Sequence, residues 1–186
     1  MPNPTCPTNC TTALVAVKFN ACAIDVHASE IKRVFIASNG TAVFTDWLIA
    51  TEWSARLAEA TTGVDKIRPL TVTGNMPAAT PNKVQISNRR TSIVGATPRT
   101  LSFTIDEVTT ENYEFMRSLE CGGIFKIWWE THGGILFGGN SGVSVTITPA
   151  HELGGGDTDI EKLVFTAEWR NRFSPERGVS PIYVEN

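Results

Sequence analysis

The sequence predicts an α+β protein, mainly an antiparallel β-sandwich or barrel with two inserted helices. Several segments alternate apolar and polar residues with the period of two that is typical of a half-buried strand. Two other segments carry apolar residues at three- and four-residue spacing, and glycine-rich turns separate the strands. A chain of 186 residues can bury one core, so we expect an extended arm over residues 1–11 and a single domain over residues 12–186.

The first part of the domain is predicted to open with strands. Apolar residues begin at 14–19, and a clearer strand covers residues 31–37. Asn39 and Gly40 follow that strand, and Asn-Gly is a strong hairpin signal because both residues tolerate positive φ. We therefore expect a return strand over residues 42–44.

An amphipathic helix is predicted next, with Thr45 or Asp46 as its N-cap and an end before Gly63. Its apolar stripe consists of Ala50, Trp53, Leu57 and Ala60. A strand over residues 67–73 follows this helix.

Residues 74–81 are predicted to form a long turn or an exposed arm, because two prolines exclude regular pairing inside a sheet. Residues 83–94 then fit either a strand pair or one long, partly exposed strand. They contain a local basic cluster, Asn88-Arg89-Arg90, which favours contact with acidic residues of a neighbouring subunit over contact with phosphate.

The second half of the chain contains the clearest pattern of buried strands. Leu101, Phe103 and Ile105 alternate with polar residues, which predicts a half-buried strand. A helix over residues 110–121 has Thr109 or Thr110 as its N-cap and buries a stripe of Phe115, Met116 and Leu119. Further strands are expected at 125–129, 135–137, 143–147 and 163–169.

Charge and hydropathy argue against several functions. The net charge of −3 gives the whole chain no electrostatic reason to bind nucleic acid or an anionic membrane. No apolar run approaches the roughly 20 residues needed to cross a bilayer. The amino terminus has no basic start before its apolar stretch, which favours an intracellular product over a secreted one.

Neither the cysteines nor the acidic loop predict a metal site. Cys6, Cys10, Cys22 and His27 have a spacing that could supply a zinc site, but the pairs do not repeat, so reduced thiols are favoured. Residues 154–159 could bind calcium, but they lack the terminal Glu of a calcium loop, which favours a solvated connection. We therefore expect no metal and no cofactor.

The sequence predicts no catalytic residue. Residues 138–142 contain Ser141 but lack the spacing of a nucleophile elbow and the Lys of a phosphate loop, so a glycine hairpin is favoured. A hydrolase would require Ser141, either His132 or His151, and Asp157 to lie together in one site. Their spacing in the sequence does not indicate that they do. The loop histidines are expected to be solvated.

The pair Trp128-Trp129 must face opposite sides of a strand, and an outward tryptophan would mark an interface. Exposed tryptophans could instead stack on sugars, so a carbohydrate- or ligand-binding module is the alternative function.

Four motifs carry a resemblance to a known class of protein: TIDE at 104–107, ENYEFMR at 111–117, GGIFKIWWE at 122–130 and LFGG at 136–139. Together they resemble virion structural proteins of tailed phages and prophages of Bacteroidetes-type bacteria. The predicted arrangement of strands, helices and a Pro-containing loop is also similar to phage tail-tube and tail-terminator folds. The likeness extends over about residues 20–183.

The resemblance implies a building block of a tail tube, a neck ring or a head–tail joint, assembled in the cytoplasm of the bacterial host and carried in the virion. It implies a homo-oligomer, most simply a hexameric ring or a stacked tube, that contacts other tail or neck proteins. DNA would pass through such a tube without sequence-specific binding. No catalytic residue is implied.

Overall fold

A computed structural model describes residues 27–58, 60–86, 90–93, 95–156 and 159–182, with the backbone alone at 86 and 90–93. The arm expected at 1–11 and the apolar stretch at 14–19 lie outside these residues. The described part is α+β, as predicted. Its elements are β1 (Ile31–Ser38), α1 (Ala50–Leu57), the 3-10 turn η1 (Gly63–Asp65), β2 (Arg68–Asn75), β3 (Lys83–Ile86), β4 (Arg90–Ile93), β5 (Thr97–Ile105), α2 (Thr110–Glu120), β6 (Ile124–Thr131), β7 (Ile135–Phe137), β8 (Val143–Glu152), β9 (Lys162–Asn171) and β10 (Arg177–Val179).

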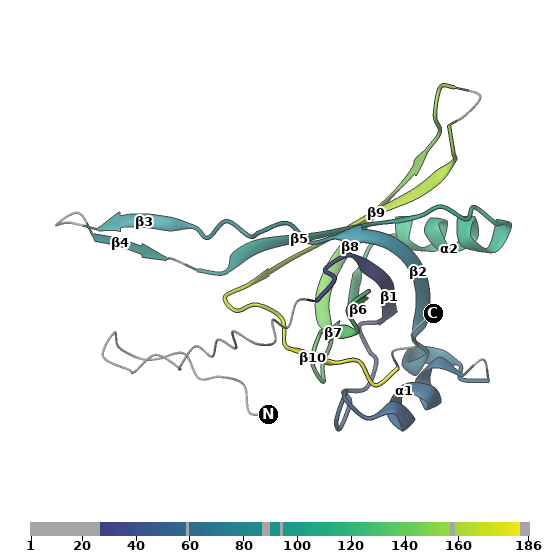
Figure 1. The fold of residues 1–186 in the computed structure, drawn as a ribbon, viewed down its shortest axis with the longest axis horizontal. Helices are drawn as coiled ribbons and strands as arrows, with labels where there is room; N and C mark the ends of the chain where they lie inside the picture. The colour runs from purple at the N-terminus through teal and green to yellow at the C-terminus, as the bar shows by residue number, and fades with distance from the viewer. Residues whose placement is uncertain (1–26, 59, 87–89, 94, 157–158, 183–186) are drawn as a thin grey trace, which may run out of the picture.

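Six strands close into an antiparallel barrel, which decides between the two predicted architectures. The strand order is β1-β2-β5-β9-β8-β6, and β6 pairs again with β1 (Figure 1). The closing register runs from Ile31 opposite Thr131 to Ser38 opposite Phe125. Strands β7 and β10 continue the sheet outward from the second half of β6.

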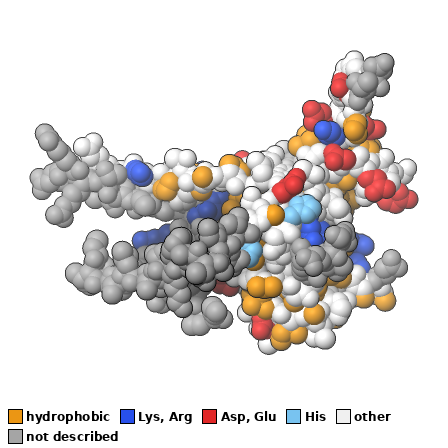
Figure 2. All heavy atoms as spheres, in the orientation of Figure 1, with side chains coloured by type: hydrophobic (Ala, Val, Ile, Leu, Met, Phe, Trp, Pro, Cys, Tyr) orange, Lys and Arg blue, Asp and Glu red, His pale blue; other side chains and the backbone are white. Residues whose placement is uncertain are grey.

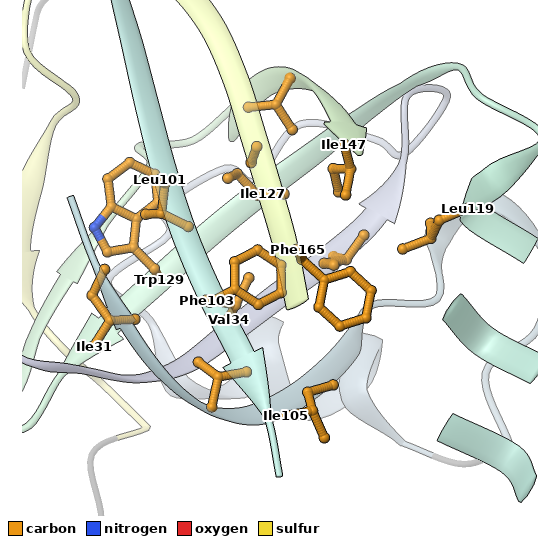
Figure 3. Close-up of a cluster of buried hydrophobic side chains, with 14 of the residues drawn as sticks. Ile31, Val34, Leu101, Phe103, Ile105, Leu119, Ile127, Trp129, Ile147 and Phe165 are labelled. Atoms are coloured by element: carbon orange, nitrogen blue, oxygen red, sulfur yellow. The ribbon is translucent and has the colours of Figure 1, made fainter. Parts of the chain in front are cut away.

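The inside of the barrel is filled by the alternating apolar residues that the sequence predicted (Figure 3). Leu101, Phe103 and Ile105 of β5 are buried, as are Leu163 and Phe165 of β9. Phe103 and Phe165 are register partners, and their rings stack with centroids 5.1 Å apart. This filled interior is the main core of the protein.

A second core lies outside the barrel, against the opposite faces of β1 and β6. Phe35 and Trp128 point out of the barrel there and are fully buried under α1 and the loop that precedes it. We call this group the outer aromatic cluster; its buried members are Phe35, Ala37, Phe44, Trp47, Trp53, Ile67, Trp128 and Leu136. Strands β1 and β6 are therefore buried on both faces, as strands in parallel sheets usually are.

The hairpin predicted at Asn39-Gly40, with its return strand at 42–44, is wrong. Both edges of β1 are already paired, one with β2 and the other with β6, so no edge is left for a third strand. The chain instead crosses the outside of the barrel as an irregular loop. Side chains bind its carbonyl groups: Lys126 Nζ donates to Thr41 O at 2.7 Å, and the guanidinium of Arg56 donates to the carbonyls of residues 42 and 43.

Helix α1 forms where an amphipathic helix was predicted, but its ends differ. The N-cap residue is Ile49, and neither Thr45 nor Asp46 caps the helix. The carboxylate of Glu52 instead accepts hydrogen bonds from the backbone N–H groups of Thr45 and Asp46. The helix ends at Leu57, where the ammonium of Lys66 donates to two of its last carbonyls.

Helix α2 agrees closely with its prediction. Of the two candidate caps, Thr109 is the N-cap, and its side chain accepts a hydrogen bond from Asn112 N at 3.2 Å. Met116 and Leu119 are buried in the main core, and Phe115 packs partly against it. No helix in the described part of the chain is long and apolar enough to span a membrane.

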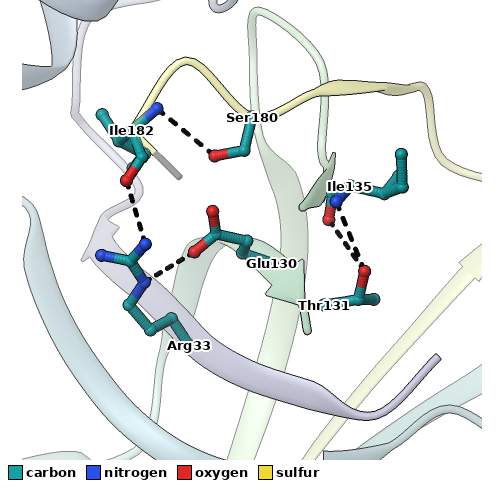
Figure 4. Close-up of polar contacts among 6 residues, drawn as sticks. All are labelled: Arg33, Glu130, Thr131, Ile135, Ser180 and Ile182. Atoms are coloured by element: carbon teal, nitrogen blue, oxygen red, sulfur yellow. Dashed lines mark hydrogen bonds and ion pairs between the residues drawn. The ribbon is translucent and has the colours of Figure 1, made fainter. Parts of the chain in front are cut away.

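An ion pair between the partly exposed Arg33 and the buried Glu130 connects the outside of the barrel to the C-terminal segment (Figure 4). Arg33 and Glu130 are partners in the β1–β6 register, and Arg33 Nε lies 2.6 Å from Glu130 Oε2. Arg33 Nη2 also donates to the carbonyl oxygen of Ile182 at 2.9 Å. Glu130 is completely buried, and its Oε1 has no hydrogen-bond partner among the described residues.

Two hairpins project from opposite ends of the barrel (Figure 1). The longer one, which we call the arm, leaves β2, forms the separate two-stranded sheet β3–β4 and returns into β5. The other is the far end of β8 and β9, which we call the acidic hairpin. The predicted loop at 74–81 begins too early, because Gly74 and Asn75 pair with Phe103 and Ser102 within the barrel.

Candidate interaction surface

The arm is the part of the molecule with the least support from its own chain. Strand β3 pairs only with β4 among the described strands, from Lys83 opposite Ile93 to Ile86 opposite Arg90. The strand pair at 83–94 was one of the two predicted arrangements. Val84 on β3 is 50% exposed. A two-stranded hairpin is marginally stable in water, and its free edges are templates for pairing with another chain.

A groove of about 500 Å³ lies at the base of the arm. The Pro-containing segment that leads from β2 into the arm forms one wall, and the residues after β9 form the other. Its apolar lining is supplied mainly by Met76, Pro77, Pro81 and Phe173. Two arginines, Arg99 and Arg172, also line the groove, and no acidic side chain does so among the described residues. The groove therefore combines apolar surface with positive charge.

Two N–H donors near this end of the barrel have no acceptor among the described residues. They are Arg99 Nε and Trp169 Nε1, both buried at the atom level. Arg99 and Trp169 are register partners on β5 and β9, so they lie on the same face of the sheet. A buried donor without a partner costs about 1–3 kcal/mol.

The tryptophans do not form an interface, contrary to the prediction for the pair Trp128-Trp129. Trp129 lies inside the barrel and Trp128 outside it, as the alternation requires, yet both are buried. The outer residue is covered by α1 and its loop, with the Trp53 and Trp128 ring centroids 5.7 Å apart. All five tryptophans are buried, so none offers the exposed ring on which a carbohydrate-binding module would depend.

The glycine-rich residues 138–142 connect β7 to β8, but they do not close the predicted hairpin, because β7 and β8 each pair with β6 and not with each other. Gly138, Gly139 and Gly142 all have positive φ. The sequence did not reveal a second requirement, which is the close approach of Trp128. A Cβ on Gly142 would lie 2.6 Å from Trp128 Cζ2, and Trp128 Nε1 donates to Gly139 O at 2.8 Å. These glycines therefore make room for the outer aromatic cluster.

The structure does not bring the hydrolase candidates together. Ser141 precedes the start of β8 and His151 lies near its other end, so they are separated by roughly 30 Å at 3.3 Å per strand residue. The Nε2 atom of His151 lies 2.6 Å from Glu161 Oε1. His132 lies in the β6–β7 turn, with its Nε2 4.0 Å from a carboxylate oxygen of Glu30. Asp157 lies outside the described residues.

The candidate metal ligands can be placed only in part. Cys6, Cys10 and Cys22 lie outside the described residues, and His27 is exposed at their boundary. In the acidic hairpin, Asp159 Oδ2 accepts a hydrogen bond from Gly156 N at 2.8 Å. Within the described ranges, no three His, Cys, Asp or Glu residues are grouped as metal ligands would be.

The basic cluster Asn88-Arg89-Arg90 is described only in part. Asn88 and Arg89 lie outside the described residues, and only the backbone of Arg90 is described. Sequence reasoning missed the groove residues Arg99, Arg172 and Phe173, because the β5–β9 register brings them together. Comparison of the chain with protein families, curated proteins and solved structures finds no match.

Proposed function

We propose that this chain is a structural building block that self-associates into a ring or a stacked tube, as part of a phage tail tube or a tail or neck ring. The observation that carries the proposal is the arm, a two-stranded hairpin that projects from a closed barrel and pairs only with itself among the described strands. Such a hairpin gains stability when another surface covers it.

The closed barrel also limits how copies can associate. Each of the six barrel strands has a paired neighbour on both sides, but β2 meets β5 only over residues 73–75 and β8 meets β6 only over residues 143–146. Among the described strands, open edges therefore lie on the arm, on the outer edge of β10 and along parts of β2, β5 and β8. Repeated contact through a projecting arm generates a closed ring or an open filament, depending on the rotation between copies. This property suits a ring or tube subunit.

The sequence resemblance gives the proposal its biological setting. It suggests a hexameric ring or stacked tube within a virion, in contact with other tail or neck proteins and with DNA passing through without sequence-specific binding. It also suggests that the protein works without catalysis and without a bound cofactor.

Sedimentation velocity over a range of protein concentrations, together with negative-stain electron microscopy, tests the proposal. We expect discrete rings or tubes for the full chain. Val84→Asp should weaken association because it places a charge on the exposed surface of the arm. Val43→Asp is the matched control, since Val43 is similarly exposed but lies in the loop before α1. A full-length protein that stays monomeric at every concentration would contradict the proposal.

A further inference from the structure

The distribution of charge along the chain is strongly uneven. Residues 66–105 contain six Lys or Arg residues and no Asp or Glu, whereas residues 106–161 contain ten acidic residues and two basic ones. Because β5 ends at Ile105, this change of sign falls where the chain passes from the arm side of the barrel to the side of α2. The net charge of the whole chain conceals this separation.

The fold places the two kinds of charge at opposite ends of one strand pair. The β5–β9 register runs from Thr97 opposite Asn171, beside the arm, to Ile105 opposite Leu163, beside the acidic hairpin. In Figure 2 acidic side chains gather over the hairpin and α2, while Lys and Arg side chains lie at the base of the arm. The molecule is therefore electrically polar along this axis.

The acidic hairpin combines its charge with exposed apolar side chains. Leu153 is 69% exposed and Ile160 is 63% exposed, and they are flanked by Glu152, Asp159 and Glu161. Neither side chain belongs to the main core or to the outer aromatic cluster. A contact with another surface would remove them from water.

The groove at the base of the arm has the complementary properties. It offers apolar surface, including Phe173 at 44% exposure, together with the guanidinium groups of Arg99 and Arg172. A carboxylate oxygen is the acceptor that a guanidinium binds most strongly, so an acidic partner suits these two side chains.

We propose that the acidic hairpin of one copy docks into the groove at the base of the arm of the next copy. This inference rests on the proposed self-association and specifies the two surfaces that meet. Because these surfaces lie at opposite ends of β5 and β9, the contact is head-to-tail and leaves one free groove and one free hairpin on every pair. Association therefore continues until a ring closes or a filament forms.

Charge exchange tests this docking. The single variants are Arg172→Glu in the groove and Glu152→Arg on the hairpin; both residues are exposed. The melting temperature of each variant checks its folding, because Glu152 lies opposite Lys162 in the β8–β9 register and Glu152→Arg places two cations side by side. Sedimentation velocity should show self-association weakened about tenfold or more in each, because like charges meet across the contact. Arg68→Glu and Glu111→Arg are matched controls at exposed positions outside both surfaces, and they should associate like the natural sequence.

Two further samples test whether the acidic hairpin contacts the groove directly. In an equimolar mixture of the two single variants, the natural hairpin of one meets the natural groove of the other, and the two substituted surfaces also carry opposite charges. The mixture should therefore recover extended association with alternating copies, while each variant alone stays weakened. The double variant Arg172→Glu/Glu152→Arg should recover the extended association of the natural sequence. Salt should weaken association of the natural sequence, because the Debye length falls from about 10 Å at 0.1 M to 3 Å at 1 M.

The outcomes separate this inference from the proposed function. If the natural sequence associates but neither single variant is weakened, or the double variant and the mixture show no recovery, the docking is wrong and self-association stands. If Arg172→Glu lowers the melting temperature of a monomer without changing association, the groove holds a segment of its own chain, such as residues 1–26. If the natural sequence does not associate at all, both proposals fail.

Discussion

The two cores of this protein are built from different kinds of segment. The main core lies inside the barrel and consists of alternate residues from six strands together with Met116 and Leu119 of α2, so each strand contributes through one face. The outer aromatic cluster consists of side chains from the other faces of β1 and β6, from α1 and from an irregular loop. Its rings meet mostly at tilted or edge-on angles, as between Phe44 and Trp128. The first core depends on strand periodicity and the second on a loop that crosses the sheet.

The largest expected effects come from truncating one large side chain in each core. Phe165→Ala and Trp53→Ala should each cost roughly 3–5 kcal/mol in the free energy of unfolding, measured by urea denaturation. Native-state hydrogen exchange then distinguishes the effects of the two variants. Phe165→Ala should reduce protection in all barrel strands, whereas Trp53→Ala should act mainly on α1 and residues 39–67. An equal loss of protection across the barrel in both variants would show that the two cores unfold as one unit.

The next effect concerns the ion pair on the outer face of the barrel. Arg33→Ala should cost about 3 kcal/mol, because it leaves the carboxylate of Glu130 buried without its cation. The double variant Arg33→Ala/Glu130→Leu should recover part of this loss, since it removes the buried charge as well. Arg68→Ala, at an exposed position, is the control and should change stability by less than about 0.5 kcal/mol. A double variant as unstable as the single one would argue against the buried charge as the cause.

A smaller effect is expected where a glycine turn supports the outer aromatic cluster. Gly138 has a φ of 136°, and a Cβ there would overlap the indole ring of Trp128. Gly138→Ala should therefore cost roughly 1–3 kcal/mol in thermal or urea unfolding. Gly155→Ala is the matched control, because a Cβ at Gly155 meets nothing within 4 Å. Similar stability of the two variants would mean that the turn can move away from Trp128.

The smallest effect concerns helix α2, which packs against the barrel. Thr109→Ala removes the side-chain acceptor for Asn112 N and should cost about 1 kcal/mol. Thr110→Ala should cost less, because Thr110 is exposed and is not the cap residue. Equal urea midpoints for these two variants would show that the cap contributes nothing to stability.

The contrast between the cores explains which parts of the fold the sequence predicted. Leu101, Phe103 and Ile105 were assigned to the core because alternation is a local pattern. Phe44 was assigned to a return strand, because nothing local indicates that both edges of β1 are already paired. The outward member of the pair Trp128-Trp129 was expected to mark an interface for the same reason, since the loop that covers Trp128 is distant in sequence.

The candidate interaction surface, like the fold, was predicted only in part. The prolines at 77 and 81 correctly indicated a segment that leaves the sheet, because proline cannot donate a ladder hydrogen bond. The groove beside it could not be predicted. Arg99 and Arg172 are 73 positions apart in the sequence, and only the β5–β9 register brings them together. The absence of acidic residues over 66–105 was the available signal of a basic surface.

The seam between β1 and β6 has a kinetic consequence. Ile31 pairs with Thr131 across 100 intervening peptide bonds, so the barrel cannot close until nearly all of its strands are in place. Proteins dominated by such distant pairings fold on a timescale of about milliseconds to seconds. Until the seam closes, β6 presents an unpaired edge and the indole of Trp128 to other newly made chains. Two rates therefore compete: the rate at which the β1–β6 seam closes, and the rate at which incompletely folded chains meet one another. Their ratio determines how much of the protein reaches its native form and how much aggregates.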